Sequence, residues 1–117
     1  MSAYDPAASS GPGWFDIVPG IRRTTVAAGQ AMMQMLVRLD AGSHLPAHSH
    51  PHEQITHVIR GRLRLVVGGV PHECGPGDTL LIPGGVEHEA DTLETAVVID
   101  TFSPPREDLL AQDRGEQ

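Results

Sequence analysis

Three histidines and one glutamine carry the side chains best suited to do chemistry in this sequence. His48, His50 and Gln54 lie in the run HSHPHEQ, and His88 ends the run PGGVEH. Imidazole nitrogens and an amide oxygen form a neutral, borderline-soft donor set that suits a divalent first-row ion such as Zn, Ni, Fe, Co or Mn. Because no carboxylate offsets the charge of such an ion, the set favours Lewis-acid work on an anionic substrate over a structural role.

The strand that follows the first cluster must turn Gln54 toward the same point as the histidines. Side chains alternate between the two faces of a strand, so Gln54, Thr56 and Val58 share one face while Glu53 points away. We therefore expect Gln54, and not its carboxylate neighbour, to be the fourth ligand. The same alternation places four side chains on one face of a later strand: Ala96, Val98, Asp100 and Phe102.

Short β-branched runs separated by Gly and Pro predict an all-β fold. The turn residues recur about every 8–12 positions, which is typical of an antiparallel sandwich or a small barrel. Gly68 and Gly69 predict the tip of a hairpin. The runs that we expect to form strands are 21–27, 31–39, 54–60, 62–67, 78–83 and 95–102.

The length of 117 residues leaves room for one hydrophobic core, and therefore for one domain. Residues 1–13 are small, polar and rich in Pro and Gly, so we expect them to form a flexible N-terminal tail. Residues 14–106 form the predicted barrel. The charged segment 107–117 is expected to be a C-terminal tail, with a short helix or a frayed end, that carries little function.

The composition argues against several classes of protein. The formal net charge is −7 and the chain has no lysine, which opposes nucleic acid and anionic membranes as partners and removes Schiff-base chemistry. Cys74 is the sole cysteine, so an internal disulfide cannot form. The sequence has no apolar run of membrane-spanning length, and residues 1–13 lack the basic and hydrophobic regions of a signal peptide. We expect a cytoplasmic protein.

Two spaced motifs resemble the pair that marks the cupin superfamily. The first is G-x5-H-x-H-x3-Q-x6-G over residues 42–61, the second is G-x5-P-x-G-x2-H over residues 77–88, and fifteen residues separate them. This resemblance implies an all-β, single-domain cupin fold, a double-stranded β-helix also called a jelly-roll barrel. Cupins usually carry Glu at the position of Gln54 and Asn at that of Thr92. This chain would therefore replace a carboxylate ligand with an amide.

Four stretches resemble, more narrowly, the small cupins that act in pectin and alginate breakdown: residues 19–23, 48–61, 76–90 and 100–108. That branch converts 4,5-unsaturated uronate sugars into linear keto acids, an isomerisation that needs no redox step and no organic cofactor. In that branch three His and one Gln hold the metal. The resemblance implies that one divalent transition metal ion is bound by His48, His50, Gln54 and His88.

The motif D-x-F-S-P-x-R near the C-terminus matches the functional Asp, Phe and Arg of the same branch. The resemblance implies that Asp100 moves protons, that Arg106 binds the substrate carboxylate, and that Phe102 forms an apolar wall against the sugar ring. From the residues alone, other roles are open. Asp100 could pair with an arginine, Arg106 could form a surface salt bridge, and Phe102 could be core.

Four other functions stay open at this point: a polyketide cyclase-like enzyme, an oxygen-activating dioxygenase, a non-catalytic ligand-binding cupin, and a cupin whose histidines merely hydrogen-bond. A cavity without a basic group near the metal would favour the cyclase. A redox-active ion, often with a carboxylate ligand, would favour the dioxygenase. The remaining histidines are predicted at the surface or rim: His44, His52, His57 and His72.

A homodimer is expected, as is common for cupins. Ile55 and Ile59 share the face opposite to Gln54 and are unusually apolar for a solvated face. Together with Leu63 and Leu65 they indicate a second sheet layer or a subunit interface.

Overall fold

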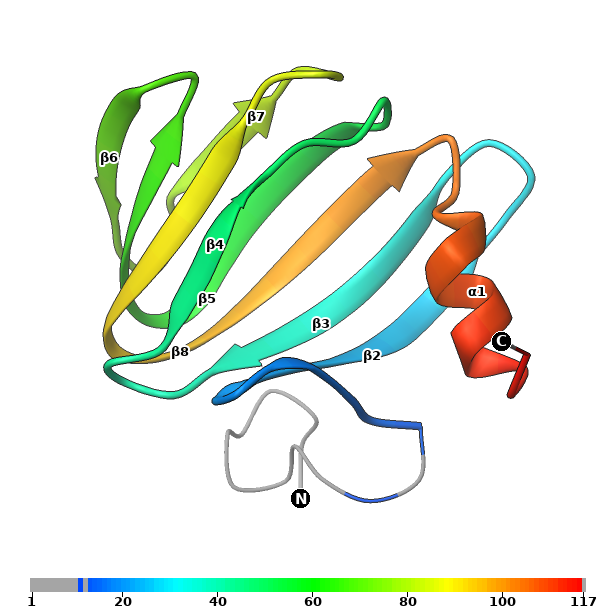
Figure 1. The fold of residues 1–117 in the computed structure, drawn as a ribbon. Coiled ribbons are helices and arrows are strands. Elements are labelled where there is room, and N and C mark those ends of the chain that lie inside the picture. Colours follow the sequence, from blue (N-terminus) through cyan, green and yellow to red (C-terminus); the bar gives the residue numbers. More distant parts are fainter. Residues whose placement is uncertain (1–10, 12, 117) are drawn as a thin grey trace.

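The computed structural model describes residue 11 and residues 13–116. The predicted N-terminal tail, residues 1–13, therefore lies almost entirely outside the described residues. Within these described residues, eight strands and one helix follow in chain order (Figure 1). The strands are β1 (Phe15–Val18), β2 (Ile21–Ala28), β3 (Met33–Leu39), β4 (His44–His48), β5 (Glu53–Val67), β6 (Val70–Cys74), β7 (Thr79–Ile82) and β8 (His88–Ser103). The helix is α1 (Glu107–Asp113).

The two longest strands, β5 and β8, each belong to both halves of the fold. Their antiparallel register runs from Glu53 opposite Ser103 to Val67 opposite His88. At one end, β8 pairs with β3 and β5 pairs with β7, and β3 continues to β2 and β1. At the other end, β8 pairs with β4 and β5 pairs with β6. All of these pairings are antiparallel, and the resulting sheet curls around one interior, as the predicted all-β barrel requires (Figure 1).

A bulge in the middle of β5 reverses which side chains face the interior. Before the bulge, Gln54, Thr56 and Val58 are buried, as alternation predicts. The register to β8 shifts repeatedly between Val58 and Leu63, and an extra residue in a strand exchanges its two faces. After the bulge, the residues at odd positions are therefore buried.

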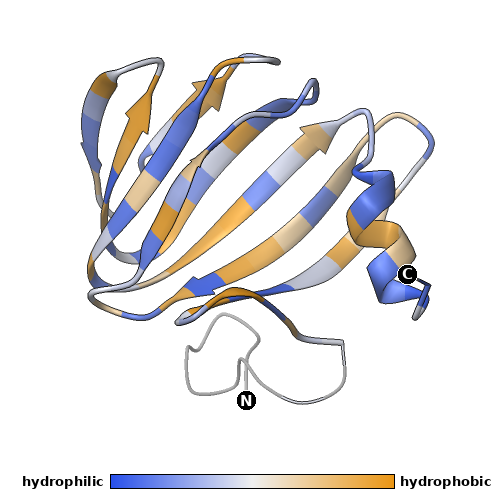
Figure 2. Cartoon of the chain, in the orientation of Figure 1, coloured by the Kyte–Doolittle hydropathy of each residue, from blue (hydrophilic) through white to orange (hydrophobic). Residues whose placement is uncertain are grey.

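The prediction that Leu63 and Leu65 belong to an outward apolar face is wrong for this reason. Their exposed fractions are 2% and 5%, and both join the core cluster. Ile55, at 42%, does face outward, as predicted. Along β5 and β8, hydrophilic and hydrophobic residues alternate in bands (Figure 2).

The hairpin that Gly68 and Gly69 predict is confirmed. It joins β5 to β6 with Val67 opposite Val70, and both glycines have positive φ, 56° and 81°. This is the backbone that a two-residue turn between right-twisted strands requires.

The segment after the barrel forms the short helix α1, which lies beside β2 and β3 at one end of the sheet (Figure 1). None of its residues is buried, but Leu109 and Leu110 pack partly against the core cluster. Among the described residues, no helix has the length and apolar character needed to cross a membrane.

Gly61 is the position where the bulge depends on glycine. Its φ is +80°, and a Cβ added there would lie 2.2 Å from the Thr95 carbonyl oxygen. Gly69 also has a positive φ, of 81°, but a Cβ added there meets no atom within 4 Å. We expect Gly69→Ala to lose about 1–2 kcal/mol of unfolding free energy from the backbone alone. Gly61→Ala should lose about 1–3 kcal/mol more from the overlap.

Urea unfolding of the two variants measures this difference. Equal losses in Gly61→Ala and Gly69→Ala would show that the close approach of β5 to β8 at Thr95 does not constrain the bulge.

Candidate metal centre

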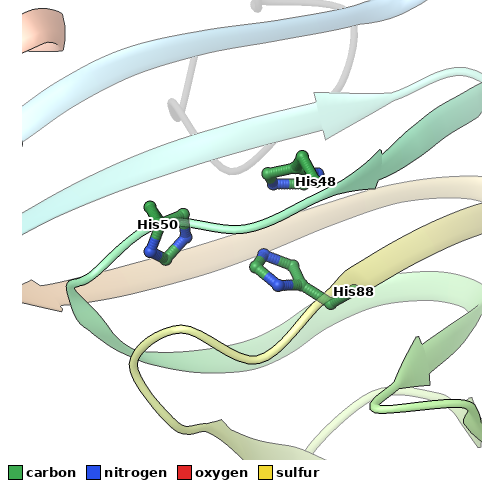
Figure 3. A group of neighbouring side chains, drawn as sticks. All are labelled: His48, His50 and His88. Carbon is green, nitrogen blue, oxygen red and sulfur yellow. The ribbon is translucent and has the colours of Figure 1, made fainter.

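Three histidine rings meet where β4 and β8 begin to separate. His48 is the last residue of β4 and lies opposite His88, the first residue of β8, while His50 lies in the loop after β4. The candidate ligand atoms of the three residues all lie within 4.8 Å of one another. Figure 3 shows the rings turned toward a common point. The strand pairing thus brings together two sequence motifs that are far apart in the chain.

The backbone sets which ring nitrogen of each histidine faces that point. The Nδ1 atom of His48 lies 2.9 Å from the Pro46 carbonyl oxygen, that of His50 lies 3.1 Å from the His52 carbonyl, and that of His88 lies 2.9 Å from the Val86 carbonyl. A carbonyl oxygen can only accept, so each Nδ1 carries the hydrogen. In the neutral ring, Nε2 then keeps its lone pair, which is the form that binds a metal.

Burial keeps at least two of these rings in the metal-binding form. Desolvation, with smaller effects of nearby His48, His50 and Arg106, lowers the pKa of His88 to about 4, against the opposing effect of the hydrogen bond to the Val86 carbonyl. Desolvation and the charge of Arg106 also lower the pKa of His50. The Nε2 atom of His88 is buried and has no hydrogen-bond partner among the described residues. A buried polar atom without a partner is costly, and a bound cation would remove that cost.

Gln54 adds an oxygen to the three nitrogens. Its Oε1 lies 2.9 Å from His50 Nε2, and its Nε2 donates to Thr56 Oγ1 at 3.0 Å. With His50 protonated on Nδ1, the facing atoms of His50 and Gln54 are both acceptors. Two lone pairs at this distance repel each other unless a cation lies between them, and neighbouring ligands of one ion adopt such a separation when each bond is about 2.1 Å long. The residues therefore fit a divalent metal ion.

Three of the four predicted metal ligands, His48, Gln54 and His88, line one part of a cavity of about 310 Å³ inside the barrel. Most of the wall is apolar and comes from the core strands. The polar and charged side chains on the wall are His48, Gln54, Thr56, His88, Glu89, Asp100 and Arg106. Of the seven residues predicted for the site, His50 alone is not on this wall; it touches the site through Gln54 and through the ring of Phe102, 5.6 Å away.

Asp100 lies on the cavity wall, from β8, with an exposed fraction of 8%. Thr56 Oγ1 donates to its Oδ1 at 2.7 Å. Burial raises the pKa of Asp100 to about 6, although the hydrogen bonds from Thr56 and Gln54 and the charge of Arg106 act in the opposite direction. A carboxyl group with a pKa near neutrality can both accept and give a proton. Thr56 was placed on the inner face by the sequence, but its link between Gln54 and Asp100 was not predicted.

Arg106 lies just before α1 and reaches over the cavity. Its Nε and Nη2 atoms donate to the two Asp108 oxygens at 3.1 and 2.9 Å, and its guanidinium carbon is 5.2 Å from the Phe102 ring centre. The side chain is 17% exposed. Arg106 therefore has both of the roles that the sequence left open: it forms a salt bridge, with Asp108, and it lines the cavity. Phe102, 1% exposed, is likewise both core and cavity wall.

The remaining histidines lie outside the cluster. His44 pairs with Asp91 at 2.8 Å, and His57 contacts Thr79 Oγ1 at 2.7 Å, both on exposed surfaces. His72 is half-buried on β6. His52 is nearest, with its ring centre 5.4 Å from that of His50, and its buried Nδ1 has no partner among the described residues.

The fold and site define the class of protein. A cupin domain family model matches residues 35–102, more than half of the chain, so the chain belongs to the cupin family, and the predicted fold class is confirmed. The pectin degradation protein KdgF of Dickeya dadantii (strain 3937) is 31% identical over 99 residues, which cover 83% of this chain and 90% of that protein. The predicted resemblance to small cupins of pectin breakdown is thereby confirmed as a resemblance.

Solved structures agree with this assignment. The structure of KdgF from Halomonas sp. superimposes with a TM-score of 0.79 at 37% identity, and the match covers 82% of this chain and 89% of that chain. An RmlC-like cupin from Shewanella frigidimarina NCIMB 400 also gives a TM-score of 0.79, at 28% identity, with 93% of this chain and 96% of that chain covered.

Metal binding can be tested with a matched pair of histidine variants. We expect the wild-type protein to retain one divalent ion per chain, and His88→Ala to lower the affinity at least about 10–100-fold, because loss of even an outer-shell partner has that effect. His57→Ala removes an imidazole from the outer face of β5 and should leave metal content unchanged. Elemental analysis and calorimetry measure both. Equal metal loss in the two variants would contradict the site.

Proposed function

We propose that this cupin is a metal-dependent isomerase that converts 4,5-unsaturated uronate sugars into linear keto acids. One observation carries the proposal. A buried carboxyl group, Asp100, and a cationic fork, Arg106, face the same cavity as the neutral donor set, so a small acidic substrate could meet all three at once. The relatives named pectin degradation protein KdgF support a substrate from that source.

The residues of the cavity argue against the two other enzyme classes, the polyketide cyclase-like enzyme and the dioxygenase. A polyketide cyclase-like function is favoured by a cavity without a basic group near the metal, whereas Arg106 lines this one. Oxygen-activating sites often include a carboxylate ligand, whereas the fourth donor here is the amide of Gln54. A substrate carboxylate is the group that suits both Arg106 and a cation held by neutral ligands.

The proposed substrate is a ring that contains an enol ether next to a carboxylate. Opening it breaks the bond between C1 and the ring oxygen as the anomeric hydroxyl loses its proton, which leaves an aldehyde at C1 and an enolate at C5. A proton delivered to C4 then gives the keto acid. A divalent ion held by His48, His50, Gln54 and His88 would supply Lewis-acid stabilisation of the negative charge that develops on oxygen.

Asp100 is positioned to move the proton between these two places. Thr56 donates a hydrogen bond to one of the carboxylate oxygens of Asp100, and the Asp100 side chain lines the cavity where the substrate would lie. Asp100 takes the hydroxyl proton and returns it to C4, so the net reaction is an isomerisation with no loss of atoms or electrons. Arg106 uses Nε and Nη2 for Asp108, and its other donors bind the substrate carboxylate while Phe102 packs against the ring.

Loss of the ultraviolet absorbance of a 4,5-unsaturated uronate measures the reaction, since the conjugated double bond disappears. We expect Asp100→Asn to lower the rate about 10²–10⁴-fold, the usual contribution of a proton-transferring group. Asp91→Asn is the control, because Asp91 lies on the same strand but pairs with His44 on the surface. A wild-type rate in Asp100→Asn would end the proposed mechanism.

We further propose that the protein is cytoplasmic.

We also propose that it forms a homodimer through the outer face of β5 and β7. Ile55 and Leu81 lie opposite each other there, with exposed fractions of 42% and 52%. Light scattering should give twice the chain mass of 12.5 kDa. Ile55→Asp should shift the protein toward monomer, whereas Val70→Asp should not, because Val70 is exposed on β6, outside the proposed interface. A wild-type monomer would contradict the proposal.

A further inference from the structure

Arg23 is a fully buried charged residue that no step of the proposed reaction uses. It lies on β2, in the sequence PGIRR, and its exposed fraction is 0%. A buried guanidinium is unfavourable unless hydrogen bonds and an opposite charge compensate it. The partners of Arg23 therefore show what its burial achieves.

Those partners lie mainly on α1, about ninety residues further along the chain. Arg23 Nη1 donates to Asp113 Oδ1 at 3.0 Å, and Nη2 donates to Gln112 Oε1 at 2.6 Å and to the Leu109 carbonyl at 3.0 Å. Thr25, two residues along β2, donates to the other Asp113 oxygen. We call these four hydrogen bonds the Arg23 clamp.

The helix depends on contacts of this kind for its position. It has seven residues, no buried residue and no side-chain hydrogen bond at its N-cap. Helices of this length are not stable by themselves in water. Two other contacts hold α1: the partial packing of Leu109 and Leu110 on the core, and the hydrogen bond from the Arg106 amide at the N-cap to Met33 Sδ on β3. The Arg23 clamp is the set of hydrogen bonds that joins the rest of the helix to β2 (Figure 1).

The first turn of the same helix fixes Arg106 at the cavity. The amides of Leu109 and Leu110 donate to the Arg106 carbonyl at 3.1 and 3.0 Å. Asp108, in this turn, accepts both hydrogen bonds that orient the Arg106 guanidinium over Phe102. A displacement of α1 would therefore carry the guanidinium away from the cavity.

We propose that Arg23 is a positioning residue: through the Arg23 clamp it holds α1 against β2, and so holds Arg106 where it meets the substrate carboxylate. The catalytic part of this inference rests on the proposed function. Arg23 itself does not line the cavity, and it reaches the cavity wall through its hydrogen bond to the carbonyl of Leu109, a residue that does line it.

The variants that test the clamp change its helix side, because removing the buried Arg23 itself risks unfolding the protein. Asp113→Ala and Gln112→Ala each remove one partner. Alanine favours helix, and the loss of an acidic group near the C-terminus also favours it, so a looser α1 could not come from poorer helix propensity. Arg114→Ala is the control, because Arg114 is exposed and pairs with Glu116 outside the clamp.

Two measurements need no activity. We expect hydrogen exchange of amides 107–113 to become faster in Asp113→Ala and Gln112→Ala, and the Arg106 Nε–H signal in NMR spectra to shift or broaden. Arg114→Ala should leave the Arg106 signal unchanged. Metal content should be the same in all variants, because the clamp contacts no ligand.

The kinetic measurement separates positioning from general loss of stability. In Asp113→Ala we expect KM for the unsaturated uronate to rise about 2- to 30-fold, the range for changes that act on a site from a distance, with a smaller change in kcat. In an Arg106→Ala background, Asp113→Ala should add nothing further, because the two changes remove one interaction. Arg23→Lys, which keeps the charge, should show a smaller KM increase than Arg23→Met.

The inference is overturned if exchange and the Arg106 signal are unchanged in both clamp variants, or if the KM increase persists in the Arg106→Ala background. If the wild-type protein does not consume the uronate at all, the proposed function fails. The exchange rates and the Arg106 Nε–H signal still decide whether the clamp holds Arg106 in place.

Discussion

The candidate site depends on three hydrogen bonds between histidine Nδ1 atoms and backbone carbonyls. Each joins a histidine to a residue two positions away, so the local backbone orients the ring. The three Nε2 lone pairs then face one point before any ion arrives, and burial favours the uncharged form of His50 and His88. An arrangement fixed in advance loses little freedom when the ion binds, which is how a small barrel can hold a metal with neutral ligands.

The amide of Gln54 adds a requirement that the usual carboxylate does not have, because an amide can point either its oxygen or its nitrogen at the metal. In this chain a relay of hydrogen bonds fixes the choice. Ionised Asp100 only accepts, so the Thr56 hydroxyl donates to it and accepts from the Gln54 amide nitrogen. The Gln54 oxygen must then face His50. The group proposed to move protons thus also orients a proposed metal ligand.

Strand alternation predicted much of this site from the sequence, because it is a local property. It placed Gln54 and Thr56 on the inner face of one strand and Asp100 on that of another, and it required no knowledge of the pairing. It failed beyond Gly61. The bulge there goes with a close approach of β5 to the Thr95 carbonyl, a tertiary contact that the sequence does not reveal, and it exchanges the faces so that Leu63 is core.

The C-terminal segment shows the other limit of sequence reasoning. Its charges suggested a tail with little function, and Arg23 fell in a strand run where arginine is usually exposed. Neither residue pattern contains the information that Arg23 and Asp113, ninety residues apart, neutralise each other. A helix without a buried residue of its own thus contributes Leu109 to the cavity wall, next to Arg106 at its N-cap. A barrel interior made of apolar strands supplies few cations for the proposed acidic substrate. Such a cation must come from outside the barrel, and in our proposal the buried charge of Arg23 on β2 holds it there.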